Sequence, residues 1–263
     1  MAALTFIPRR FTTVDRRATI CAAVHTPPVG GAIFPHNARD RARAVGCEAE
    51  EASVSQDGSA AFWLAAEPLI LASKSKGRRM ALEQSGLPFL IHPAEIDERA
   101  IETEVVAAGG DADAVAARLA RDKASLVSRT RPGALVVGAD QVASCEGRRF
   151  GKPATVAAAA EQLRYLSGRT HRLHSAIALA RDGHIIFETL AHADLTMRAV
   201  SSEFLARYLD SVAEEATTSA GAYQIEGLGV HLFECVAGDH WTIVGLPMLP
   251  LLAALRREGA LLS

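Results

Sequence analysis

The chain has 263 residues, of which 49% are hydrophobic, and a formal net charge of −2 at neutral pH. This composition supports a folded core and gives no reason to expect nucleic acid as a partner, because proteins that bind a phosphate backbone usually carry a basic excess. No apolar run reaches the roughly 18 residues of a membrane-spanning helix, so we expect no membrane association. The cysteines form no C-x-x-C pair, which argues against a zinc site and a disulfide framework and favours a cytoplasmic location. They are Cys21, Cys47, Cys145 and Cys235.

Residues 1–66 differ from the rest of the chain in composition and in the pattern of apolar residues. They contain Pro27-Pro28 and Gly30-Gly31 and show no sustained helical or alternating period. A targeting peptide would account for the arginines at 9, 10, 16 and 17, which lie among threonines. We favour a disordered extension, or upstream sequence included through a wrong start codon, followed by one domain over residues 67–263.

From Leu69 onward, apolar strands alternate with helices. The pattern predicts a strand at 69–72, a helix at 78–85 that ends at Gly86, and a helix at 111–128. A compact apolar strand at 135–139 is typical of strands buried on both faces. A further helix is expected at 155–167.

The second half of this region begins with a predicted hairpin. Asp182-Gly183 is a strong turn signal between strands at 173–180 and 184–189. A half-exposed strand at 191–197, a helix from Ser201, two strands around Gly238-Asp239 and a helix at 248–257 follow. The sequence therefore predicts a single α/β domain with a mixed sheet.

Two basic features are candidates for phosphate binding. The loop Ser73–Arg79 contains two hydroxyls and four cations where a strand leads into a helix, whose free N–H groups attract anions; the alternative is a solvated turn that only caps the helix. Lys123 projects from the apolar side of its helix, where an ammonium either snorkels to water or meets an anion.

Carboxylates supply the third candidate. Asp140-Gln141 directly follows the buried strand at 135–139, and sites in open α/β sheets lie outside such strand ends. A carboxylate there can hold a divalent metal or accept a proton from water, whereas an ordinary turn aspartate is the alternative. Asp97-Glu98 could add a second metal ligand, although surface acids are more common.

Other features carry weaker signals when taken singly. Lys152 before Pro153 could present a cation, or be an exposed loop lysine. Glu226 lies in the glycine-rich segment 221–229 and could accept hydrogen bonds from a base edge. His171 and His174 are interpreted as strand histidines held by hydrogen bonds.

Taken in order, these segments resemble the Maf family of nucleoside-triphosphate pyrophosphatases. The matching pieces are LASKSKGRR, EIDE, RLARDKA, VVGADQV, GKP, LSGRTH, SAGAYQIEGLGVHLFE and TIVGLP, which together cover nearly all of residues 69–260. The resemblance implies a long curved mixed sheet with two lobes around a central cleft, a homodimer, and hydrolysis of a nucleoside triphosphate to a monophosphate and pyrophosphate with Mg²⁺ or Mn²⁺.

The resemblance also implies roles for individual residues. Asp140 matches the proton acceptor, Glu98 its partner in holding metal and water, and Lys123 and Lys152 the lysines that face phosphate. Ser73, Ser75 and Arg78 match the substrate-binding loop.

The resemblance further links base choice with three family positions, which Gly77, Gln141 and Glu226 match. Asp140-Gln141, Gly151-Lys152-Pro153 and Glu226 resemble the 7-methyl-GTP branch more than the dTTP/UTP branch, whereas Gly77 departs from both. The alternative function is a nucleotide-binding regulator of cell division whose hydrolysis is incidental, and a house-cleaning enzyme for inosine-type nucleotides is a further option.

Overall fold

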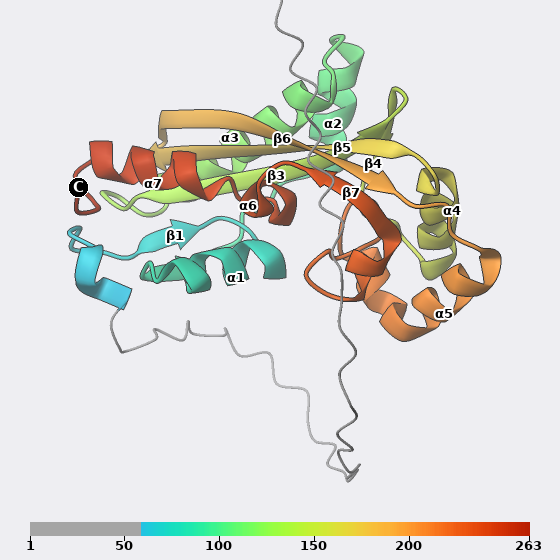
Figure 1. Ribbon diagram of the computed structural model, residues 1–263. Coiled ribbons are helices and arrows are strands. Elements are labelled where there is room, and N and C mark those ends of the chain that lie inside the picture. The colour runs from blue at the N-terminus through green and yellow to red at the C-terminus, as the bar shows by residue number, and fades with distance from the viewer. Residues whose placement is uncertain (1–58) are drawn as a thin grey trace, which may run out of the picture. The chain divides into compact units, whose positions relative to one another are not determined.

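The computed structural model describes residues 59–263 (Figure 1). The expectations of a disordered extension or a targeting peptide concern residues that lie outside this range, except for 59–66. The described residues form a mixed α/β fold on one seven-stranded sheet with the order β2-β1-β3-β5-β6-β7, and β4 pairs with β3. This confirms the predicted α/β class and its mixed sheet.

The sheet has a short parallel part and a long antiparallel part. β1 is parallel to β2 and β3, whereas β4, β5, β6 and β7 all pair antiparallel with their neighbours. The strands are β1 (Leu69–Leu71), β2 (Phe89–Ile91), β3 (Val136–Cys145), β4 (Arg148–Phe150), β5 (Thr170–Arg181), β6 (His184–Met197) and β7 (Phe233–Ala237).

Helix starts follow capping residues in the sequence. Ser75, Asp111, Thr155 and Ser201 each accept a hydrogen bond from a backbone N–H three residues later, which satisfies a donor that the helix leaves free. The helices are α1 (Lys76–Ser85), α2 (Glu98–Ala107), α3 (Ala112–Arg129), α4 (Val156–Leu166), α5 (Ser202–Val212), α6 (His240–Val244) and α7 (Met248–Arg257). Within the part of the chain that the structure describes, no helix has the length and apolar character needed to cross a bilayer.

The two faces of the sheet carry different helices. Val142 and Ala176 pack on α3 on one face, whereas Val137 and Ala139 face α1 and α7 on the other (Figure 1). Because side chains alternate along a strand, Asp140 points to the α3 face and Gln141 to the opposite face.

The face opposite α3 carries two separate hydrophobic cores. The first includes Val137 and Ala139 of β3 with α1 and α7, and the second includes Ala143 and Cys145 with α4 and α5. Gln141 is the β3 residue between them on this face, so a polar position divides the two cores. The two lobes implied by the resemblance correspond to these two cores; the central cleft stays a prediction.

Two expectations about individual elements are wrong, and a third is confirmed with different bounds. Asp140-Gln141 lies in the middle of β3 and not after its end, because the strand continues against β5 to Cys145. The half-exposed strand expected at 191–197 is present, but it is continuous with the strand expected at 184–189, and together they form β6. The second of the two strands expected around Gly238-Asp239 is helix α6, which Asp239 caps by accepting from the N–H of Thr242.

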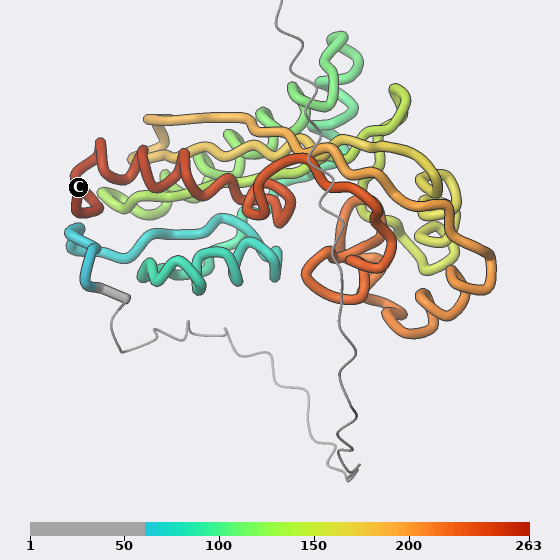
Figure 2. Tube along the Cα trace, viewed as in Figure 1, coloured from blue at the N-terminus to red at the C-terminus, as the bar shows by residue number. Residues whose placement is uncertain are grey.

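The described chain begins beside its own C-terminal segment (Figure 2). The N–H of Leu64 donates to the carbonyl of Ala260, and the N–H of Leu262 donates to that of Phe62. Trp63 packs against the core formed with α7. Residues upstream of the expected domain start at 67 therefore pack on the domain.

Candidate active site

Lys123 is the centre of a buried charge cluster. Its Nζ lies 2.6 Å from Oδ1 of Asp140 and 2.6 Å from Oε1 of Glu98. Only 5% of Lys123 is exposed, so the ammonium does not snorkel to water but meets two carboxylates. Helix α3 contributes the lysine, β3 the aspartate and the first turn of α2 the glutamate.

The approach of α3 to the sheet depends on Gly138. A Cβ at this position would lie 2.2 Å from the carbonyl oxygen of Ala120 and 2.5 Å from the amide nitrogen of Ala124. Only glycine allows the helix backbone to come this close to β3, and Lys123 thereby reaches Asp140. Gly138 is not among the predicted site residues, although a glycine inside an apolar strand is a signal of close backbone approach.

The pKa values of Asp140 and Glu98 are shifted in opposite directions. Burial raises the pKa of Asp140 above its usual value, more than the charges of Lys123 and Arg78 lower it. Partial burial also acts to raise the pKa of Glu98, but the charges of Lys123 and Lys152 outweigh it and the pKa is lowered. The two neighbouring carboxyls are therefore held in different environments, as acid–base pairs often are.

Arg78 is the cation of the basic loop that turns inward. It is buried, its Nε donates to the carbonyl of Gly245, and its Nη1 donates to Ser73 Oγ (2.9 Å) and to the carbonyl of Ala139 (2.8 Å). Ser75 caps α1 by accepting from the N–H of Arg78. The loop therefore caps the helix, as the alternative expected, but it also fixes a buried guanidinium beside β3.

The rest of this loop presents exposed cations and free backbone amides. Lys74, Lys76 and Arg79 are exposed and do not join the buried cluster. Among residues 59–263, the N–H groups of Lys76 and Gly77 donate no hydrogen bond. They are the free amides of a helix N-terminus, which attract negative charge.

Lys152 lies on the exposed loop after β4 and completes the cluster electrostatically. Loss of surrounding water and the positive charge of Arg78 lower its pKa, whereas the charges of Glu98 and Asp140 raise it. Within the described range it forms no ion pair or side-chain hydrogen bond. Its ammonium is thus available to an additional anion.

The three positions linked with base choice are connected through α6. The Nε2 of Gln141 donates to Ser175 Oγ and to the carbonyls of Thr242 and Ile243 at the end of this helix. The next residue, Val244, would lie 2.9 Å from a Cβ at position 77. Oε1 of Glu226 would lie 3.6 Å from the same Cβ. Gly77 and Glu226 are therefore neighbours, and Gln141 holds the end of α6 that packs against Gly77.

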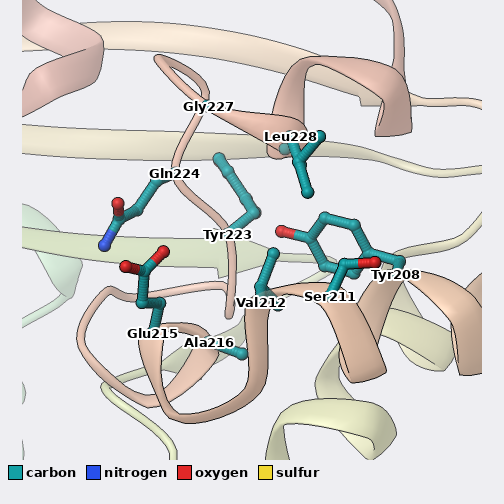
Figure 3. A pocket seen from close by; sticks show the side chains of 10 residues that line it. Tyr208, Ser211, Val212, Glu215, Ala216, Tyr223, Gln224, Gly227 and Leu228 are labelled. Carbon is teal, nitrogen blue, oxygen red and sulfur yellow. The ribbon is translucent and has the colours of Figure 1, made fainter. Parts of the chain in front are cut away.

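A small cavity lies beside the glycine-rich segment. It measures about 70 Å³ and is bordered by α5 and by Gly227 and Leu228 (Figure 3). None of the predicted site residues lines it. The charge cluster, and not this cavity, is the candidate active site.

A mixed α/β sheet that gathers two carboxylates and three cations, with free helix amides beside them, defines a class of protein that binds a polyanionic ligand. The comparisons with known proteins identify the family within this class. The family described as "Maf-like protein" matches residues 68–258. The chain belongs to this family.

Curated relatives match nearly their whole length. A nucleoside triphosphate pyrophosphatase from Rhodopseudomonas palustris is 52% identical over 201 residues, which cover 76% of this chain and 98% of the relative. A 7-methyl-GTP pyrophosphatase from Rhizobium etli is 54% identical over 193 residues, 73% of this chain and 97% of the relative. A nucleoside triphosphate pyrophosphatase from Nitrobacter winogradskyi is 50% identical over 202 residues, 76% of this chain and 98% of the relative.

Proposed function

We propose that the chain is a nucleoside-triphosphate pyrophosphatase, a hydrolase acting on acid anhydrides that releases a nucleoside monophosphate and pyrophosphate. The observation that carries the proposal is the contact of Lys123 with both Asp140 and Glu98 next to buried Arg78. The names of the relatives at about 50% identity support the same activity.

The proposed roles follow from charge and position. Asp140 accepts a proton from the water that attacks the α-phosphorus, and its raised pKa brings it nearer to neutral pH than an ordinary aspartate. The bond from the α-phosphorus to the bridging oxygen breaks, and the electron pair leaves with pyrophosphate. Arg78, Lys123 and Lys152 stabilise the negative charge that develops on the phosphate oxygens. Ser73 holds Arg78 in place, and the amides that follow Ser75 bind a phosphate oxygen.

The donor set fits a hard divalent cation. Lys123 brings the two carboxylates together, because its Nζ lies 2.6 Å from one oxygen of Asp140 and 2.6 Å from one oxygen of Glu98. Within the described chain, the other oxygen of each carboxylate accepts no hydrogen bond, and Mg²⁺ and Mn²⁺ prefer oxygen ligands. We propose these two residues as the metal ligands. When bound, such an ion supplies charge neutralisation to the triphosphate.

For the substrate, we propose 7-methyl-GTP as the first compound to test. The support is Asp140-Gln141 and Glu226 in the chain and the name of the Rhizobium etli relative. Methylation at N7 gives the guanine ring a positive charge, and the carboxylate of Glu226, adjacent to Gly77, complements that charge.

Pyrophosphate release from a panel of 7-methyl-GTP, GTP, UTP, dTTP and ITP, with Mg²⁺ or Mn²⁺, tests the activity and the substrate together. We expect turnover of at least one compound, with 7-methyl-GTP preferred, and a loss of about 10²–10⁴-fold in Asp140→Asn. Background release from every compound would reject the activity. A preference for UTP and dTTP would reject the substrate while leaving the activity.

The rival function, a regulator of cell division, is not favoured by the names of the relatives. It predicts that Asp140→Asn still blocks division on overexpression despite losing turnover. A cytoplasmic location and a homodimer belong to the proposal, and light scattering on the eluting protein tests the dimer.

A further inference from the structure

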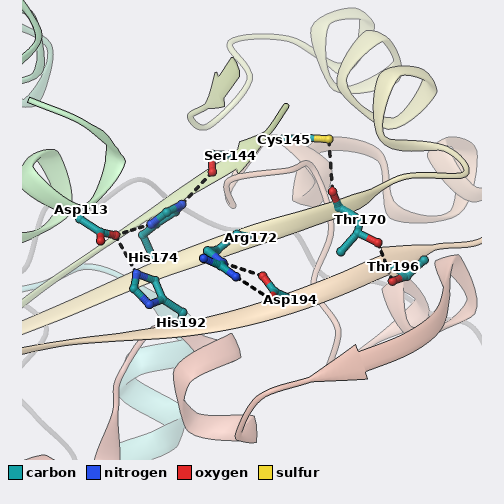
Figure 4. Close-up of polar contacts among 9 residues, drawn as sticks. All are labelled: Asp113, Ser144, Cys145, Thr170, Arg172, His174, His192, Asp194 and Thr196. Carbon is teal, nitrogen blue, oxygen red and sulfur yellow. Dashed lines mark hydrogen bonds and ion pairs between the residues drawn. The ribbon is translucent and has the colours of Figure 1, made fainter. Parts of the chain in front are cut away.

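A second polar cluster lies on the α3 face of the sheet. It consists of Asp113 in the first turn of α3, His174 on β5 and His192 on β6 (Figure 4). Asp113 is ten residues before Lys123 on the same helix, which is about 15 Å along the helix axis. None of the three residues contacts Lys123, Asp140 or Glu98 in the described structure, although His174 pairs with Val142, two residues after Asp140 on β3.

The pairing of the strands brings the two imidazoles together. His174 and His192 are directly opposite each other in the β5–β6 register, and their ring centroids are 5.1 Å apart. Oδ1 of Asp113 accepts hydrogen bonds from Nδ1 of His174 and from Nε2 of His192, the latter at 2.8 Å. Two imidazoles thus converge on one carboxylate oxygen.

The carboxylate of Asp113 has no strong cation beside it. Among the described residues, its ion-pair partners are the two histidines and no lysine or arginine. The nearby Arg172 is engaged by both oxygens of Asp194, at 2.7 and 2.8 Å. A bound cation would therefore be the first strong positive charge beside Asp113 among the described residues.

We propose that Asp113, His174 and His192 form a binding site for one first-row transition-metal ion of the zinc class. Their ligand atoms all lie within 4.8 Å of one another. A tetrahedral ion with bonds of about 2.0–2.1 Å needs ligand atoms about 3.3 Å apart, which small side-chain rotations achieve. The cysteines play no part in this site.

The donor types select the kind of metal. Imidazole nitrogens suit Zn²⁺, Co²⁺, Ni²⁺ and Cu²⁺, whereas Mg²⁺ and Ca²⁺ prefer oxygen. The site therefore differs from the carboxylate pair Asp140 and Glu98. His174 is buried, but the side chain of His192 is 37% exposed, so an ion and its remaining water ligand have access from solvent.

Ser144 supports the ligand role of His174. Its Oγ lies 2.7 Å from Nε2 of His174, the nitrogen that does not face Asp113. A metal-binding histidine usually donates its other N–H to a neighbouring acceptor, which fixes the ring. A hydroxyl both donates and accepts, so Ser144 pairs with His174 in the metal-free and the metal-bound tautomer.

Binding of Zn²⁺ to the full, chelator-treated chain tests the proposal by calorimetry without any nucleotide. Excess Mg²⁺ in the buffer occupies the carboxylates of the proposed active site. We expect one Zn²⁺ per chain, a Kd at least tenfold weaker in His192→Ala and in Asp113→Asn, and a higher thermal unfolding temperature with Zn²⁺. Co²⁺ should give the visible absorption of a nitrogen- and oxygen-bound ion.

His184→Ala is the matched control, because His184 is an exposed histidine on the same strand, and it should bind as the unaltered chain does. Ser144→Ala should weaken binding about tenfold without removing a ligand. No saturable binding of Zn²⁺, or binding that His192→Ala and Asp113→Asn leave unchanged, would overturn the site. Because the readout is binding, its failure is distinct from failure of the proposed pyrophosphatase activity.

Discussion

At the scale of single residues, the ammonium of Lys123 compensates two carboxylates at once. A buried ion pair that loses one partner leaves an uncompensated charge, which typically costs about 3–5 kcal/mol. Loss of Lys123 should affect Asp140 more than Glu98, because Asp140 is buried whereas the side chain of Glu98 is 51% exposed to solvent. The ionisation of Asp140 therefore depends on Lys123.

Lys123→Met should shift the pH dependence of turnover. Burial already raises the pKa of Asp140, and Lys123 is the largest charge that lowers it. Removal of the lysine raises that pKa further, so the acid limb of kcat/KM moves to higher pH and the plateau falls. The measurement is the pH profile of pyrophosphate release.

Arg121→Met provides the control on the same helix, because Arg121 forms an exposed ion pair with Glu188 and does not contact Asp140. Its profile should match that of the unaltered chain. An acid limb in Lys123→Met that stays in place or moves to lower pH would contradict the role assigned to this charge.

His171 should make stability depend on pH. Its Nε2 lies 2.6 Å from the hydroxyl of Tyr223, its Nδ1 has no partner in the described structure, and burial lowers its pKa from 6.5 to about 4. Between these values the unfolded chain binds more protons, so stability falls as the pH falls, by about 3 kcal/mol over the full range.

Thermal unfolding from pH 7 to pH 4 measures this effect. His171→Gln keeps a hydrogen-bonding group and should flatten the decline, whereas the same exchange at exposed His184 should not. An equal decline in both variants would assign the pH dependence to other groups.

At the scale of elements, the contact between α3 and β3 decides the geometry of the charge cluster. Gly138→Ala should destabilise the fold by about 3 kcal/mol or more, because the added carbon meets the backbone of Ala120 and Ala124. Chemical denaturation measures the loss. Gly151→Ala should be nearly neutral, since a Cβ there meets nothing within 4 Å; a similar loss in both variants would exclude backbone contact as the cause.

Elements whose sequence signals lie within the element itself were predicted well from the sequence, and elements that depend on distant residues were not. Helices α3 and α7 carry their own caps or apolar periods, and their predicted ranges agree with the structure to within a residue. The three-residue strands β2 and β4 are too short to show a period. Asp140 is inside β3 because β5 pairs with it from more than thirty residues away along the chain, and no local pattern reveals that pairing.

Local signals also limited how much of the candidate site could be predicted from the sequence. The apolar arc of α3 identifies Lys123 as a lysine that needs an anion, but it does not identify the two carboxylates that it meets. The contacts of Gln141 with α6 join residues about a hundred positions apart. Glu98 and Lys152 gave only weak local signals, and their specific roles came from the family resemblance and not from the pattern of residues.

At the scale of the whole molecule, the folded region and the preceding segment should respond differently to protease. Relatives align over 193–202 residues that cover 97–98% of their own length. Because Phe62 and Leu64 pair with the C-terminal segment, we propose that the separate segment ends before residue 62 and not at the expected residue 66. Limited proteolysis should yield a resistant fragment that begins close to this point, identified by mass. A resistant fragment that begins well upstream would contradict this boundary.

The link through α6 has a consequence for redesign of base preference. A large side chain at position 77 displaces Val244, and the end of the helix that carries Val244 is held by Gln141. The effect of an exchange at one of these positions therefore depends on the residue at the other, so single changes and the combined change will not add. On the proposal that these positions set base choice, a new nucleotide selectivity has to be installed as a set, with residues 77, 141 and 226 altered in concert.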